Sequence, residues 1–230
     1  MPNIIFRPNS KEAELTVAKP VPAKNYLPNW FKQCPMHTTD RLEFDSEGES
    51  NLTMKACVPF VDTFLTGYIQ ETWCDVYINT NTGEYRFSTS PQIMTHRAED
   101  KQHYPKIQNF NKQEFVWHQV WIPELPEGYS MLYTHPLNRY DLPFKSLSGI
   151  IDHDGLIMEK IATHPFFIQE GFEGIIPKGT PMFQMIPIKR ESWQSSFEEY
   201  NENLLIESGK IRQFFTGGYK KLFWKKKDYK

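Results

Sequence analysis

The chain has 230 residues, a formal net charge of −2, 15% aromatic residues and 17 prolines. This charge balance offers no electrostatic basis for binding nucleic acid or a membrane surface, and no window approaches the roughly 20 apolar residues of a membrane span. The prolines argue against a helix bundle, and the aromatic share favours strands. The three cysteines form no CxxC pair, so we expect no disulfide framework, no zinc site and a cytoplasmic location.

The predicted organisation is a single domain of three stretches. Residues 1–52 would hold a short strand at 3–7 and an extended, proline-rich arm over 18–35. Residues 53–191 would form a β-rich core, and residues 192–230 a C-terminal helix followed by a basic, aromatic tail. Apolar spacing predicts a short helix within 53–67 with Gly67 at its C-terminal end.

The core is predicted to be rich in strands joined by glycine and proline turns. The clearest hairpin joins residues 68–79 to residues 84–88 through a turn at 79–83. Further strands are expected at 114–122, 129–135, 143–151, 155–161, 165–168 and 181–188. Short strands with such turns favour a mainly β, jelly-roll or sandwich-like fold.

The C-terminal stretch combines a predicted helix with lysines and aromatic residues. Ser192 is a suitable N-cap for a helix from about 192 to 208. The tail from residue 220 interleaves lysines with Phe223, Trp224 and Tyr229. Such a tail can stack on single-stranded nucleic acid, but we favour packing on the protein itself or on a neighbouring subunit. Nucleic acid is therefore an unlikely partner, and a homo-oligomer or a protein partner is expected.

Several polar residues are candidates for chemistry. Asp152 and Asp154 flank His153 just before Gly155, a pattern typical of a β-turn and, as the less favoured interpretation, of a catalytic or metal site. His135, His153 and His164 are candidate metal ligands of a cupin-like enzyme, although the His-x-His spacing of cupins is absent. Gln184 would point outward from an alternating strand or inward as a polar anchor, and the outward orientation is slightly favoured.

Four segments resemble an uncharacterised family from tailed phages and bacteria. They are PxPAKNYLPNWFK, PFKSLSGIIDHDG, IPKGTPMFQMIPIKRESW and the aromatic, lysine-rich tail, and the similarity covers nearly the whole chain. The family has no established activity, so the resemblance implies little about function. The protein would act in the host cytoplasm if phage-encoded, and association with a virion stays an open alternative.

A second, partial resemblance, over residues 125–190, is to the dUTPase and dCTP deaminase β-fold. It is carried by serines before a Gly-Ile-Ile-Asp-His-Asp turn and by a later glutamine strand. The resemblance implies a possible nucleotide ligand, Mg²⁺ as cofactor, Asp152 or Asp154 activating water, and phosphate held by Lys145, Ser146, Ser148 and Gln184. The Pro-Arg-Ser and Tyr-Arg-Gly motifs of those enzymes are absent.

No catalytic motif is complete in this sequence. We therefore predict an accessory protein that acts by protein–protein contact. The alternatives are a dUTPase-like nucleotide-binding or Mg²⁺-dependent nucleotide-hydrolysing protein and a cupin-like metal-dependent enzyme.

Overall fold

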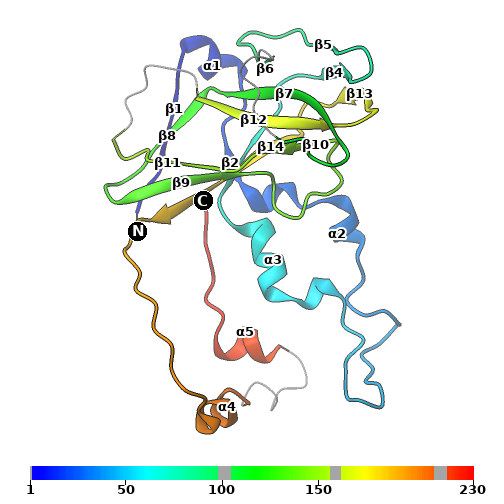
Figure 1. Cartoon of the computed structure of the whole chain (residues 1–230), viewed down its shortest axis with the longest axis vertical. Coiled ribbons are helices and arrows are strands. Elements are labelled where there is room, and N and C mark those ends of the chain that lie inside the picture. The colour runs from blue at the N-terminus through cyan, green and yellow to red at the C-terminus, as the bar shows by residue number, and fades with distance from the viewer. Residues whose placement is uncertain (1, 98–104, 156–161, 210–216) are drawn as a thin grey trace. The chain divides into compact units, whose positions relative to one another are not determined.

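The computed structural model describes residues 2–97, 105–155, 162–209 and 217–230 (Figure 1). Antiparallel strands dominate it, and its helices are few and short, which confirms the mainly β prediction. The strands described form separate sheets rather than a closed barrel. No helix among the described residues is long and apolar enough to cross a membrane.

The chain divides into two compact units. The first, here called the sheet unit, comprises Met1–Tyr26, Gly67–Arg190 and Lys230. The second, the helix unit, comprises Leu27–Thr66 and Glu191–Tyr229. The single domain expected from the sequence stays a prediction, because the contacts divide the chain into these two units.

The sheet unit contains every named strand of the described structure. One sheet has the order β11-β9-β14-β3-β2 and another the order β10-β12-β7-β6. Two smaller sheets have the orders β13-β4-β5 and β1-β8. The bounds are β1 Ile5–Pro8, β2 Val21–Pro22, β3 Tyr68–Glu71, β4 Val76–Asn79, β5 Glu84–Arg86, β6 Met94–His96, β7 Phe110–Gln119, β8 Trp121–Glu124, β9 Tyr129–Thr134, β10 Phe144–Ser146, β11 Gly149–Ile151, β12 Ala162–Gln169, β13 Glu173–Ile176 and β14 Pro181–Lys189.

Aromatic and aliphatic side chains from the two larger sheets share one core. Trp117 on β7 stacks on Phe166 of β12 with ring centroids 3.8 Å apart, and Phe144 of β10 meets both rings edge-on. Met131 on β9 and Phe183 on β14 are buried in the same cluster. Burial of such large rings on both sheets accounts for the high aromatic content. In Figure 1 the strands β7 and β12 run above β9 and β14.

The hairpin predicted from a turn motif is present, whereas two long strands predicted from apolar runs each divide into two. Strands β4 and β5 pair antiparallel, with Tyr77 opposite Arg86, so the predicted hairpin is confirmed, although β3 joins a different sheet. The strand predicted at 114–122 is two strands, because the chain leaves one sheet after Gln119 and enters another at Trp121. The strand predicted at 143–151 likewise divides into β10 and β11. Residues 156–161 of the strand predicted at 155–161 lie outside the described residues.

The proline-rich arm is helical rather than extended over much of its length, so that prediction was wrong. Short helical turns occupy η1 Ala23–Tyr26 in the sheet unit and α2 Asn29–Gln33 in the helix unit. Pro28 is the N-cap of α2, where its missing N–H costs no hydrogen bond. Phe31 of α2 packs against Phe64, with ring centroids 4.8 Å apart, and this contact favours the helix over an extended arm.

The predicted helix within 53–67 is confirmed. It consists of the turn η2 Met54–Ala56 and the helix α3 Val58–Leu65. Gly67 follows the helix with φ of +76°, the left-handed conformation that glycine adopts most readily. Helix α1 Lys11–Thr16, which the sequence did not predict, is capped by the hydroxyl of Ser10 accepting from the Ala13 amide.

The C-terminal helix is much shorter than predicted. Residues 191–201 have no regular structure, and α4 runs only from Glu202 to Ser208. The side chain of Asn201, rather than that of Ser192, caps α4 by accepting from the amide of Asn203. A further short helix, α5 Gly218–Leu222, precedes the end of the chain.

Candidate functional site

The Asp152–Gly155 segment is a turn whose two carboxylates bind Arg190. Asp154 accepts the backbone N–H of Gly128 at 2.9 Å and a guanidinium N–H of Arg190 at 3.0 Å. These hydrogen bonds, led by that of Arg190, lower the pKa of Asp154 to about 2. Asp152 accepts the hydroxyl of Ser130 and lies 3.3 Å from Arg190. The pairing fixes the turn against the end of β14 and makes Asp154 a weak general base.

The residues expected to hold phosphate do not gather on one face. Ser146 and Gln184 are buried, and each has a partner inside the protein. The Ser146 hydroxyl donates to the carbonyl of Met182 at 2.7 Å, and Gln184 Oε1 accepts the Leu137 amide at 2.8 Å. Lys145 and Ser148 are exposed instead. The outward orientation of Gln184 was wrong, because residues 181–185 of β14 are buried in succession and both faces of the strand are covered there.

The three candidate histidines do not form one site. His135 Nε2 donates to the carbonyl of Arg139 at 2.9 Å, and its Nδ1 accepts the Ser146 amide at 3.3 Å. His153 and His164 both pack against the ring of Tyr133. Among the described residues, no three His, Cys, Asp or Glu side chains are arranged to hold a metal ion. A cupin-like centre thus has no assembled ligand set in the described part of the chain.

A neutral polar cluster lies in the core where His153 and His164 meet Tyr133. The Tyr133 hydroxyl and His153 Nε2 are 2.7 Å apart, and His164 Nε2 donates to Gln119 Oε1 at 2.8 Å. Burial lowers the pKa of His153 to about 4 and that of His164 to about 3, and it raises the pKa of Tyr133. Gln119 lies on β7 and Tyr133 on β9, so the cluster joins the two larger sheets. Its buried, neutral groups are suited to holding the core together.

The helix unit contains a largely apolar pocket of about 450 Å³, here called the tail pocket. Its apolar walls come from the 36–65 region and from the C-terminal tail, and include Leu42, Leu52, Val58, Val61, Leu65 and Trp224. Its polar lining includes Lys55, Asp62 and Lys220. The volume falls within the range of about 300–1,000 Å³ typical of ligand sites.

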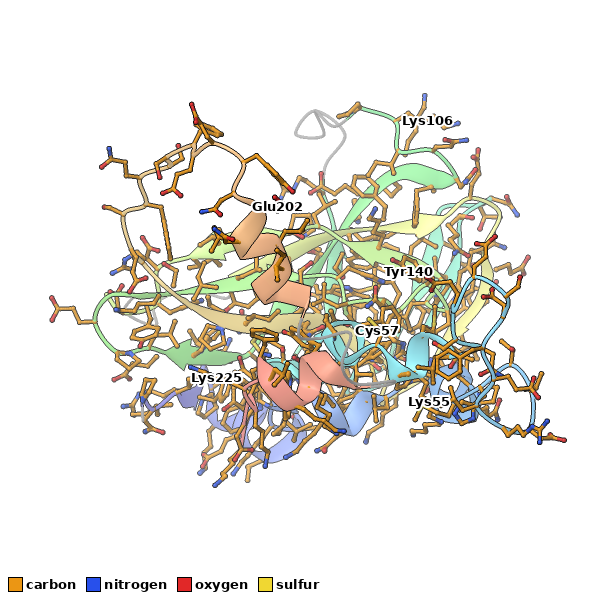
Figure 2. The ribbon with its side chains drawn as sticks, turned by 90° about the horizontal axis from the view of Figure 1, so that it is seen from below. Lys55, Cys57, Lys106, Tyr140, Glu202 and Lys225 are labelled. Atoms are coloured by element: carbon orange, nitrogen blue, oxygen red, sulfur yellow. The ribbon has the colours of Figure 1, made fainter. Side chains whose placement is uncertain are left out.

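The pocket is built by contacts between α3 and the tail. The Trp224 indole N–H donates to Asp62 Oδ2 at 2.9 Å, and Lys227 Nζ donates to the same oxygen at 2.5 Å. Lys55 Nζ donates to the carbonyl of Cys34 at 2.7 Å, which ties the turn η2 to the end of α2. Lys55 and Cys57 are labelled beside the cyan ribbon of this region in Figure 2. Within the helix unit, the predicted packing of the tail on the protein itself is therefore observed.

The second feature of the helix unit is an exposed run of apolar side chains, residues 191–206, here called the acidic segment. Phe197 is 97% exposed and Trp193 is 87% exposed, and Tyr200, Leu204 and Ile206 are also mostly exposed. Residues 191–207 include glutamates but no lysine or arginine. Exposed apolar clusters of this kind are typical of interaction surfaces. The apolar spacing that suggested a helix here was the signal that could have identified this surface.

No protein-family model, curated protein or solved structure matches this chain. The functional interpretation therefore rests on the two features of the helix unit and on the chemistry of their side chains.

Proposed function

We propose that this chain is an accessory protein that acts by protein–protein contact, and that the acidic segment supplies the contact surface. For the sheets we propose a jelly-roll-like arrangement, the finer form of the predicted fold.

The observation that carries the proposal is the exposure of Trp193, Phe197 and Ile206 within one short segment. Each large apolar side chain left in water forgoes about 1.5–3 kcal/mol of burial free energy, so a run of them favours a partner that covers it. Trp, Tyr and Phe are also the side chains most enriched at protein interfaces. Glu198, Glu199 and Glu202 lie among these apolar residues, and their negative charge keeps the segment hydrated before binding.

Co-purification from the cell that makes this protein tests the proposal. The tagged wild-type chain is compared with the triple variant Trp193→Ser, Phe197→Ser and Ile206→Ser after chemical cross-linking. The matched control is Tyr140→Ser, since Tyr140 is 84% exposed and lies in the sheet unit (Figure 2).

We expect the wild-type and Tyr140→Ser chains to be recovered with the same stoichiometric protein, whether another protein or a second copy. The triple variant should lose most of it, by at least tenfold. Equal recovery by all three chains would contradict the proposal.

A further inference from the structure

The tail pocket and the acidic segment have complementary chemistry on every copy of the chain. We infer that the acidic segment of one copy binds in the tail pocket of a second copy, so that the protein associates with itself. This inference rests on the proposed function and names the partner of that surface.

The tail pocket offers apolar walls with a positive rim. Lys220 lines it and is exposed, with its ammonium 6.0 Å from the ring centroid of Trp224. Lys55 also lines it, with its ammonium held by backbone carbonyls that leave its charge in place. The one acidic lining residue, Asp62, is hydrogen-bonded to Lys227 and Trp224, which offsets its charge. An incoming group that is both apolar and negative fits this lining best.

The acidic segment has this chemistry. Leu204 and Ile206 are exposed on α4, and Glu202 begins the same helix. Glu198 and Glu199 stand between the exposed rings of Phe197 and Tyr200. An apolar side chain entering the pocket would thus bring a carboxylate close to the lysines at its rim.

A second copy is the partner that satisfies both surfaces at once. The residues that line the tail pocket come from the 36–65 and 217–224 regions, and none comes from the acidic segment. Each copy therefore presents a pocket and a segment, and a two-fold arrangement would use both pairs. The net charge of −2 is too small to keep copies apart by repulsion.

The inference is tested by measuring the mass of purified full-length chains by sedimentation, with variants in which side-chain charges are reversed. One variant carries Lys220→Glu in the pocket, and the other carries Glu199→Lys with Glu202→Lys in the segment. All three altered side chains are exposed, so the fold should be retained, and circular dichroism checks this. Wild-type chains should show twice the mass of one chain at micromolar concentrations.

We expect each variant to self-associate at least tenfold more weakly than wild type, because each places like charges across both contacts. An equimolar mixture of the two variants should recover the doubled mass, since both contacts then join opposite charges. A monomeric wild-type chain, or a mixture that stays monomeric, would overturn the inference. If the inference fails in this way but co-purification recovers a different protein, the proposed function is still supported.

Discussion

Burial determines what His153 and His164 can do. Both side chains are nearly inaccessible to water, and each is neutral at pH 7 because burial lowers its pKa well below 6.5. A neutral imidazole that is hydrogen-bonded to a buried tyrosine or glutamine supports the core. At the residue scale, the structure gives both histidines hydrogen-bond partners inside the protein.

The two histidines should make stability depend on pH. Below pH 6.5 the unfolded chain takes up protons that the folded chain does not, until pH reaches about 4 for His153 and about 3 for His164. Stability should therefore fall as pH falls, by on the order of 1–2 kcal/mol per histidine between pH 7 and pH 5. Urea unfolding at both pH values measures this. His164→Gln, which keeps a donor for Gln119, should reduce the loss by on the order of 1–2 kcal/mol, the share of that one histidine. An unchanged loss would contradict the assignment.

Gly67 should be intolerant of any side chain. A Cβ at this position would lie 2.1 Å from the carbonyl oxygen of Met185, and φ is +76°. Gly171 has the same φ but nothing within 4 Å of its added Cβ, so it is a matched control. Gly171→Ala should cost about 1–2 kcal/mol. Gly67→Ala should cost at least about 2 kcal/mol more, because backbone must move. Equal unfolding free energies for the two variants would refute the close approach.

At the scale of elements, the sequence predicted features that depend on neighbours along the chain. The β4–β5 hairpin follows from the turn at Asn79–Gly83, and α3 ends where Gly67 permits the left-handed conformation. Features that depend on distant neighbours were missed. Gln184 is buried because both faces of β14 are covered over residues 181–185. The 192–208 helix fails over its first turns because nothing described buries its rings. The tail pocket joins segments far apart in sequence, which no local pattern predicts.

The contact between the tail and α3 should protect the tail from proteolysis. Asp62 holds both Trp224 and Lys227, so Asp62→Asn removes the charge that binds Lys227. Trypsin should then cleave after Lys225, Lys226 or Lys227 several-fold faster than in the wild-type chain. Asp40→Asn, at an exposed aspartate of the same unit, is the control and should leave the rate unchanged. Cleavage at the wild-type rate in Asp62→Asn would show that this contact does not hold the tail.

At the scale of the whole molecule, the two units have different characters. The sheet unit buries an aromatic core and a polar cluster, and Arg190 pairs with both carboxylates of its Asp152–Asp154 turn. The helix unit has a smaller cluster of rings and presents both an apolar pocket and an exposed acidic segment. Under the proposed function, the sheet unit is the scaffold and the helix unit is the part that binds.

Site-specific photo-cross-linking inside the cell tests this division most directly. A benzophenone-bearing amino acid replaces Phe197 in one chain and Tyr140 in another, both highly exposed in the wild-type protein. We predict a discrete cross-linked product from position 197 and none from position 140, with the product's mass identifying a second copy or a different protein. Irradiation that yields no product from position 197, in a chain that is folded and expressed, would contradict the claim that the acidic segment is a protein-binding surface.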